Sequence, residues 1–313
     1  MNLTTRLRLG VAAVGALAAV AAFASPTVAA EAPPGPGAPP GPVALTEAQP
    51  GAPAQAALAP GAEYVSLGDS YGAGTGVFPL AEGPPPWCLQ SSQNYSHLVA
   101  AQLGYRLTDV SCGSATAIGL GLPLYPGMRP QLDALTPTTE LVTLMVGGND
   151  HNTFGGAVAA CIAARASNPG AYDPCRAQYG AGMFAPIVTG THPDLVGALR
   201  AIHARSPRAR VVVVGYPWLF PGSGSCAAQI PVADGDMGYL RELQTVLNDA
   251  MRRAAQETDS AFVDMSQVSD GRDGCQPAGH RWVEPILNTG QPIHPNAAGE
   301  RAIADQVVAV LGR

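Results

Sequence analysis

The sequence contains no lysine, and all 17 of its basic residues are arginine. This absence excludes the phosphate-binding lysine of P-loop proteins, lysine Schiff bases and serine–lysine catalytic dyads. Charged residues of either sign are scarce, at 13% of the chain, and no run of basic residues occurs. Because the formal net charge is -6, we do not expect the protein to bind nucleic acid.

Long apolar segments are also missing, except for one near the N-terminus. Residues 1–30 have the order of a secretory signal, with Arg6 and Arg8 first, then a short apolar run and small residues. Cleavage is expected after Ala24 or after Ala30. The apolar run is shorter than the roughly 20 residues that span a bilayer. We therefore expect a secreted protein that inserts stably into no membrane, and we expect it to be a monomer.

The remaining chain divides by composition into two parts. Residues 31–61 are mostly proline, glycine and alanine with little to bury, which predicts a linker without a fold of its own. Residues 62–313 are then a single folded domain of about 250 residues. Because 47% of the whole chain is hydrophobic, this domain has enough apolar side chains for a large core.

Six cysteines in a protein that we expect to be exported predict disulfide bonds. Six cysteines allow fifteen pairings, and the sequence alone does not choose among them. The simplest pairing joins neighbours, as Cys88–Cys112, Cys161–Cys175 and Cys226–Cys275. A zinc site is disfavoured because no close Cys-x-x-Cys or Cys/His cluster occurs, and no metal or cofactor is expected.

Apolar runs of strand length alternate with helical patterns along the domain. Strands are predicted at residues 64–67, 106–111, 141–146, 210–215 and 261–264. Helices are predicted at residues 94–103, 154–166, 195–204, 237–257 and 297–311, with a long irregular region around 161–190. Continuously apolar strands separated by helices predict an α/β domain with a parallel sheet covered on both faces, although the strand order does not follow from the sequence.

Small and polar residues stand at the carboxyl ends of three predicted strands, where functional groups of a parallel sheet gather. These segments are Gly68-Asp69-Ser70, Cys112-Gly113-Ser114 and Gly147-Gly148-Asn149-Asp150. A serine at the point where a strand becomes a glycine-rich turn is suited to be a nucleophile. The backbone N–H groups of Ser70 and Gly113 and the side-chain amide of Asn149 are suited to hold an oxyanion.

A serine nucleophile needs a base, and without lysine this base must be histidine. Of the six histidines, His97 and His203 lie within helical patterns as surface or packing residues, and His192 and His280 lie in irregular sequence with no supporting pattern. His151 adjoins the Gly147–Asp150 segment and is a second candidate. His294 directly precedes the last predicted helix, where Pro295 and Asn296 are typical helix-start residues, so it is the predicted base.

These residues resemble the signature of the SGNH hydrolases, also called GDSL lipases and esterases, and the resemblance extends from Val65 to the C-terminus. Ser70, Gly113, Asn149 and His294 match its four signature positions in order and approximate spacing. The cysteines and the export signal resemble, more narrowly, the secreted actinobacterial lipase/esterase branch. The resemblance implies a flavodoxin-like, three-layer α/β/α fold and serine ester hydrolysis without metal or cofactor.

The sequence departs from the family pattern at two positions. Tyr71 follows Ser70 where the family usually has leucine, and we expect it to contribute to the pocket wall. Gln291 stands three residues before His294, where most members have aspartate. We expect the backbone carbonyl of Gln291 to accept the Nδ1 proton of His294 instead. A carboxylate out of register, Glu284 or Asp264, remains an alternative.

The predicted reaction is hydrolysis of carboxylic esters through an acyl group on Ser70. Apolar residues of the loops are candidates for the acyl site, namely Phe78, Leu80, Trp87, Leu120, Leu122, Leu124, Tyr125, Phe154, Tyr216, Trp218 and Phe220. Aromatic residues make up only 6% of the chain, which favours a lipid or small ester over a sugar ester as the substrate. Two alternatives are a carbohydrate O-acetylesterase and a non-catalytic secreted binding protein on the same scaffold.

Overall fold

The computed structural model describes residues 57–312 of the chain. The predicted signal segment, residues 1–30, and nearly all of the predicted linker, residues 31–61, lie outside the described residues. The first strand begins at Glu63 and the last helix ends at Val310.

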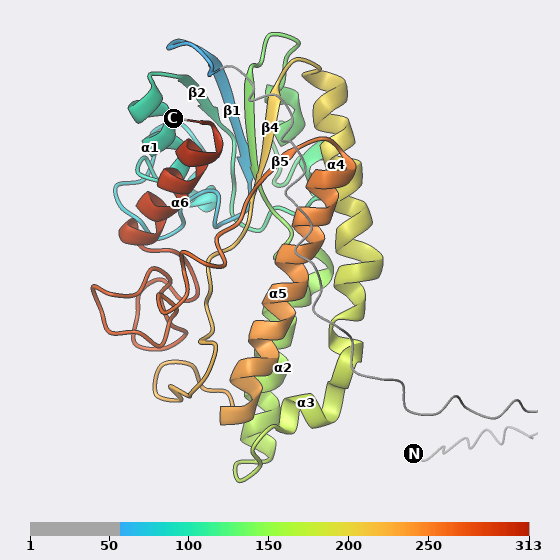
Figure 1. The fold of residues 1–313 in the computed structure, drawn as a ribbon, viewed down its shortest axis with the longest axis vertical. Coiled ribbons are helices and arrows are strands. Elements are labelled where there is room, and N and C mark those ends of the chain that lie inside the picture. Colours follow the sequence, from blue (N-terminus) through green and yellow to red (C-terminus); the bar gives the residue numbers. More distant parts are fainter. Residues whose placement is uncertain (1–56, 313) are drawn as a thin grey trace, which may run out of the picture. The chain divides into compact units, whose positions relative to one another are not determined.

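The centre of the fold is a parallel sheet of five strands in the order β2-β1-β3-β4-β5 (Figure 1). The strands are β1 (Glu63–Gly68), β2 (Arg106–Asp109), β3 (Leu141–Met145), β4 (Arg210–Val214) and β5 (Ala261–Val263). β3 lies in the middle of the sheet and is buried at every residue, as its continuous apolar sequence predicts. β2 lies at an edge, and its residues are partly or fully exposed.

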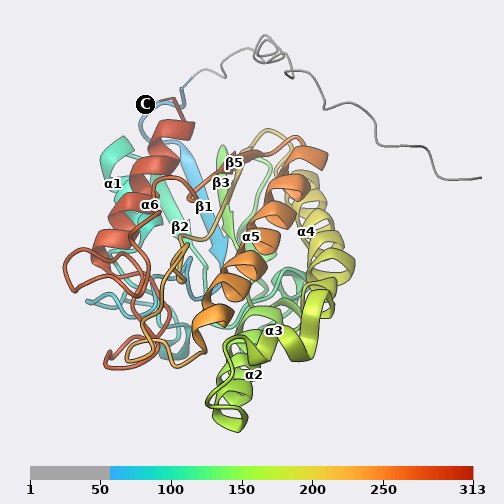
Figure 2. The same cartoon turned by 60° about the horizontal axis from the view of Figure 1, so that its bottom comes forward.

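Helices cover both faces of this sheet. The helices are α1 (Tyr95–Leu103), α2 (Thr153–Ser167), α3 (Pro174–Tyr179), α4 (His192–Arg205), α5 (Asp234–Glu257) and α6 (Ala297–Val310). α1 and α6 pack together on one face, and α4 and α5 pack together on the other (Figures 1 and 2). The predicted three-layer α/β/α architecture is confirmed.

α5 illustrates why the sequence specifies these helices. Leu240, Leu243, Leu247 and Ala250 recur at intervals of three and four residues, so one face of the helix is apolar. All four side chains are buried against the core. The helix runs for 24 residues and begins three residues before the predicted start, and its first turn includes the buried Asp236.

The expectation of an irregular region around residues 161–190 was wrong in part, because α3 lies within it. The carboxylate of Asp236 accepts hydrogen bonds from the backbone N–H groups of Cys175 (3.0 Å) and Arg176 (3.0 Å) at the start of α3. A disulfide joins Cys175 to Cys161 on α2. A helix of six residues that depends on such distant partners leaves no periodic signal in its own sequence.

The structure has three disulfides, Cys88–Cys112, Cys161–Cys175 and Cys226–Cys275, which is the neighbour pairing that the sequence analysis considered simplest. Each disulfide ties a loop or short helix to a neighbouring part of the domain. Within residues 57–312, none of the helices combines the length and the apolarity needed to cross a membrane.

Candidate active site

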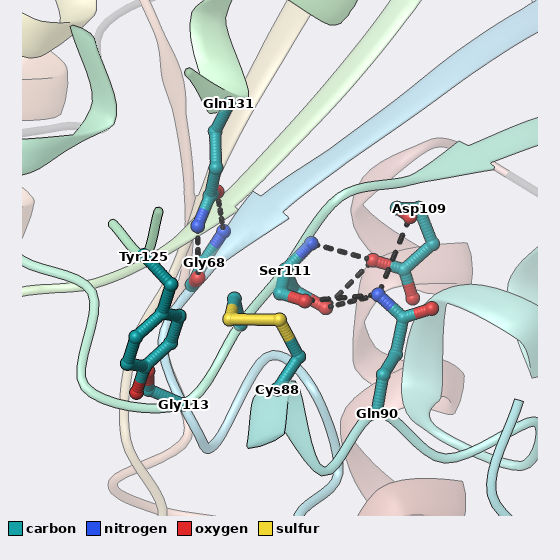
Figure 3. Close-up of a disulfide and its surroundings, with 9 residues drawn as sticks. Gly68, Cys88, Gln90, Asp109, Ser111, Gly113, Tyr125 and Gln131 are labelled. Carbon is teal, nitrogen blue, oxygen red and sulfur yellow. Dashed lines mark hydrogen bonds between the residues drawn. A yellow bond between two sulfur atoms is a disulfide. The ribbon is translucent and has the colours of Figure 1, made fainter. Parts of the chain in front are cut away.

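The predicted nucleophile lies in a tightly held turn at the carboxyl end of β1. The backbone of Gly68 exchanges two hydrogen bonds with the side-chain amide of Gln131, both of 2.9 Å (Figure 3). The backbone N–H of Asp69 donates to the Met145 carbonyl oxygen at 2.9 Å. A Cβ atom on Gly68 would lie 2.7 Å from that same oxygen, so this position requires glycine. Ser70 therefore lies two residues beyond a rigidly held strand end.

The carboxylate of Asp69 is buried beneath the turn. It accepts hydrogen bonds from the Tyr71 backbone N–H (2.9 Å) and from the Tyr216 hydroxyl (2.6 Å). The Tyr216 oxygen in turn accepts the backbone N–H of Gly148 at 3.0 Å. Burial raises the pKa of Asp69 to about 7, against the opposing effect of these donors. This network connects the ends of β1, β3 and β4.

Three of the predicted site residues meet at one cavity. Ser70, Asn149 and His294 line a cavity of about 100 Å³ at the carboxyl edge of the sheet. Phe154 and Leu247 supply part of its apolar wall. Residues separated by more than two hundred positions in the sequence are thus brought together at the place where parallel sheets hold their functional groups.

His294 is oriented by a backbone carbonyl, but the carbonyl belongs to Pro292. The Nδ1 atom of His294 lies 2.7 Å from the Pro292 carbonyl oxygen. The expectation for the Gln291 carbonyl was therefore wrong by one residue. The reason is the backbone of Ile293, whose φ of 61° turns the chain so that the nearer carbonyl faces the ring.

The two carboxylates considered as alternatives contact other groups. Glu284 accepts hydrogen bonds from Arg281 (2.9 Å) and from the side chain of Asn296 (2.9 Å). Asp264 accepts the backbone N–H of Ser266 at 2.8 Å. In the described part of the chain, neither carboxylate completes a triad with His294.

The other ring nitrogen of His294 is available for chemistry. Nε2 is buried and has no hydrogen-bond partner among residues 57–312. Burial lowers the pKa of His294, and the hydrogen bond to the Pro292 carbonyl opposes this shift. The imidazole is therefore neutral at pH 7, with a proton on Nδ1 and a lone pair on Nε2.

The two predicted strand-end donors differ in their availability. The Nδ2 atom of Asn149 donates one hydrogen to the Ala115 carbonyl oxygen at 3.0 Å, which leaves its second hydrogen free for a ligand. The backbone N–H of Gly113 donates to the Cys88 carbonyl oxygen at 3.0 Å, and Gly113 does not line the cavity. This structure therefore does not offer Gly113 as an oxyanion donor, contrary to the sequence expectation.

The Gly113 contact has a visible cause in the surrounding covalent structure. The disulfide joins Cys88 to Cys112, the neighbour of Gly113, so the two backbones run close together (Figure 3). The segment leading to Gly113 is held further by Asp109, whose carboxylate accepts the Ser111 backbone N–H at 2.9 Å.

The remaining histidines lie elsewhere. His151, the second candidate for the base, pairs with Asp194 at 2.9 Å and does not line the cavity. The side chains of the other four histidines contact Asp109 (His97), Glu257 (His192), Ser260 (His203) and Arg272 (His280).

The expected acyl-site residues are mostly not at the cavity. Of that set only Phe154 and Tyr216 line it. Leu120, Trp218 and Phe220 belong to the buried core, whereas Phe78, Trp87 and Leu122 are exposed. Apolar composition alone did not separate core from pocket.

Two residues that shape the site were not recognised in the sequence. Tyr216, considered only as an acyl contact, lies two residues beyond the end of β4, and the rule that identified the other strand ends could have identified its role. Gln131, which holds Gly68, lies in a short helical turn far from any motif and gives no signal of its own.

Comparisons with known proteins find similar sequences and similar folds. A family model described as "GDSL-like Lipase/Acylhydrolase family" matches residues 66–302. The chain is 48% identical over 265 residues to Lipase 2 of Streptomyces coelicolor, covering 83% of this chain and 89% of that protein. Phospholipase A1 from Streptomyces albidoflavus NA297 has a similar structure, with a TM-score of 0.66, 25% identity, and coverage of 80% of this chain and 99% of that one. An extracellular lipase from Streptomyces rimosus has the same TM-score and coverages at 26% identity.

Proposed function

The chain belongs to the GDSL-like lipase/acylhydrolase family and is a carboxylic ester hydrolase, and we propose that it is a secreted enzyme that cleaves fatty-acyl esters through an acyl group on Ser70. The observation that carries this proposal is the cavity shared by Ser70, Asn149 and His294, with the unpartnered Nε2 of His294 beside it. The signal-like N-terminus and the three disulfides support secretion.

In the first half of the reaction, Nε2 of His294 takes the proton of the Ser70 hydroxyl as the oxygen attacks the ester carbonyl carbon. The hydrogen bond from Nδ1 to the Pro292 carbonyl keeps the ring in the tautomer that has its lone pair on Nε2. Because burial lowers the pKa of His294, the base is in its active, neutral form at pH 7.

The tetrahedral intermediate has a negatively charged oxygen that needs donors. No described residue accepts a hydrogen bond from the Ser70 backbone N–H, which is therefore free to donate, as is the second hydrogen of Asn149 Nδ2. Loss of one such donor typically costs about 10²–10³ in kcat. His294 then protonates the departing alcohol, and water activated by the same nitrogen releases the acid from Ser70.

The test of this mechanism compares wild type with Ser70→Ala and His294→Ala on p-nitrophenyl butyrate. Both variants should lose at least about 10³ in kcat. A fluorophosphonate reagent should label the wild type at Ser70 and fail to label Ser70→Ala. Wild-type activity in Ser70→Ala would refute the assignment of the nucleophile, and absence of ester hydrolysis in the wild type would favour the non-catalytic binding protein.

The preferred length of the acyl chain is tested separately. The cavity of about 100 Å³ has Phe154 and Leu247 in its wall, which suits the first carbons of an acyl chain. We expect kcat/KM to rise from acetate to butyrate and longer p-nitrophenyl esters. A preference for acetate would favour the carbohydrate O-acetylesterase, for which the small volume of the cavity is the supporting observation.

A further inference from the structure

Tyr71, the residue that departs from the usual Gly-Asp-Ser-Leu pattern, connects the two catalytic residues. Its side chain is only 7% exposed. Its hydroxyl donates a hydrogen bond to the carbonyl oxygen of Ile293. Tyr71 directly follows Ser70 in the sequence, and Ile293 directly precedes His294. One side chain therefore joins the turn that carries the proposed nucleophile to the loop that carries the proposed base.

The ring of Tyr71 also contacts the ring of His294. The two ring centroids lie 5.2 Å apart, with an angle of 41° between the planes. On another side, Tyr71 meets Tyr216 edge-to-face at a centroid distance of 5.0 Å. Tyr216 is itself fixed, since its hydroxyl donates to Asp69 and its backbone exchanges two 2.9 Å hydrogen bonds with the side chain of Asn248. Tyr71 is thus packed between a rigid support and the imidazole.

The peptide group that Tyr71 holds adjoins the one that orients His294, and the two meet at Ile293. Ile293 is a β-branched residue with a φ of 61°, a conformation that costs on the order of 1–3 kcal/mol. This turn directs the Pro292 carbonyl back to Nδ1 of His294. The N–H of Ile293 donates to the Glu284 carbonyl oxygen at 3.1 Å, and its carbonyl accepts from Tyr71. The two peptide groups that flank the strained Ile293 are therefore both held.

We propose that Tyr71 is a positioning residue for His294: its phenol fixes the imidazole by holding the Ile293 carbonyl and packing against the ring, and so adds to the orientation that the Pro292 carbonyl gives at Nδ1. This inference rests on the proposed function, because it assumes that His294 is the base for Ser70. The role is one of position and not of proton transfer. Burial raises the pKa of the Tyr71 hydroxyl, so the phenol stays neutral.

The test uses two variants of Tyr71 and one matched control. Tyr71→Phe removes only the hydroxyl, and Tyr71→Leu removes the ring as well. The control is Tyr105→Phe, since Tyr105 is also 7% exposed and its hydroxyl also donates to a backbone carbonyl, that of Leu58 at 3.4 Å. Measurements are kcat and KM on p-nitrophenyl butyrate, the rate of Ser70 labelling by a fluorophosphonate, and the melting temperature.

We expect kcat to fall about tenfold in Tyr71→Phe and about a hundredfold in Tyr71→Leu, with KM within about twofold of wild type. The labelling rate should fall in parallel, because labelling also needs the base in place. The melting temperature of Tyr71→Phe should fall no further than that of Tyr105→Phe. The acid limb of the kcat/KM profile should move to higher pH in Tyr71→Leu, because a less buried imidazole has a pKa closer to its ordinary value.

The inference is overturned if Tyr71→Phe keeps kcat within about twofold, or if its loss appears only in KM. It is also overturned if the loss of kcat accompanies a fall in melting temperature well beyond that of the control. Failure of the proposed function gives a different result, since Ser70→Ala would then retain activity in the same assay. Loss of activity in Ser70→Ala with full activity in Tyr71→Phe rejects the positioning role alone.

Discussion

The loop that carries the nucleophile and the loop that carries the base are built by different means. The nucleophile loop, residues 68–76, begins at the last residue of β1. Its backbone is fixed at that end by the Met145 carbonyl, by the side-chain amide of Gln131 and by close packing at Gly68. The base loop, residues 284–296, has no regular structure and contains two non-glycine residues with positive φ, Asn288 and Ile293. Backbone hydrogen bonds to Trp282 and Gln229 hold it near its two ends, and the side chains of Glu284 and Tyr71 add contacts around His294.

This difference predicts different responses to mutation. Backbone packing leaves no space for an added atom, so the nucleophile loop is sensitive to small increases in volume. The base loop has polar side-chain contacts in addition to its backbone hydrogen bonds, so loss of one side-chain partner should loosen it without unfolding the domain. A change in the nucleophile loop should thus affect stability and activity together, whereas a change in the base loop should affect mainly activity.

The largest effect is expected for Gly68→Ala. The new Cβ would lie 2.7 Å from the Met145 carbonyl oxygen, and neither strand is free to move. We expect a loss of about 1–3 kcal/mol in unfolding free energy and at least a hundredfold loss of kcat. Urea denaturation and ester hydrolysis measure the two quantities.

Gly238→Ala is the matched control for this change. Gly238 lies inside α5, and a Cβ there meets no atom within 4 Å. It should leave activity unchanged and stabilise the protein by up to about 1 kcal/mol through helix propensity. If the two substitutions changed the unfolding free energy and kcat equally, close packing at Gly68 would not be what makes the nucleophile loop sensitive.

A smaller effect, confined mainly to activity, is expected for Glu284→Gln. This substitution removes the charge that Arg281 and Asn296 contact across the base loop. We expect kcat to fall about fivefold and the unfolding free energy to fall by about 1 kcal/mol. Glu242→Gln, which breaks the exposed pair with Arg176, is the control and should change neither quantity measurably. If Glu284→Gln lowered the unfolding free energy more than Gly68→Ala does, the proposed difference between the base loop and the nucleophile loop would be contradicted.

The sequence predicted the nucleophile loop better than the base loop because the nucleophile loop is positioned by a strand and the base loop by contacts from distant parts of the chain. Ser70 and Asn149 follow strongly apolar strands, and the geometry of a parallel sheet brings strand ends to one edge whatever the strand order. His294 was recognisable from the helix that follows it, but the carbonyl behind it was not. That carbonyl depends on the φ of Ile293, a conformation imposed by Tyr71 and the Glu284 backbone from distant parts of the chain.

Gly113 shows a further limit of reading strand ends. Its position at the edge of the sheet was predicted, yet the direction of its N–H depends on the Cys88 carbonyl, which the disulfide holds nearby. The order of the strands and the role of Gln131 depend likewise on contacts between segments that carry no shared local pattern. Local chemistry predicted which residues matter, and tertiary contacts decided where their polar groups point.

The two loops should also respond to pH with opposite signs. Burial raises the pKa of Asp69 to about 7, above the roughly 3.9 of an unfolded chain, so the folded state holds an extra proton between these values. The unfolding free energy contributed by Asp69 therefore falls as pH rises through this interval. For Glu284, burial acts to raise the pKa, but hydrogen bonds from Arg281 and Asn296 outweigh it and lower the pKa. The contribution of Glu284 is present at neutral pH and is lost as pH falls below its ordinary range.

Differences in unfolding free energy between wild type and each variant, measured from pH 3 to pH 8, test this contrast. The difference for Asp69→Asn should decline as pH rises from about 4 to about 7. The difference for Glu284→Gln should instead decline as pH falls below about 4.5. Parallel curves for the two variants would show that the loops do not differ in this respect.

The smallest effect is expected for Gln291→Ala. The side chain of Gln291 lies against Gly76, where an added Cβ would come within 2.2 Å of its Cδ atom, and this is a second contact between the two loops. Because Nδ1 of His294 is hydrogen-bonded to the backbone carbonyl of Pro292 and not to Gln291, we expect kcat/KM to stay within about twofold of wild type. Steady-state kinetics beside His294→Ala measure the difference. A tenfold loss would mean that the Gly76 contact, and not only the Tyr71 contact with Ile293, holds the base in place. A negligible loss would leave Tyr71 as the connection between nucleophile and base on which activity depends.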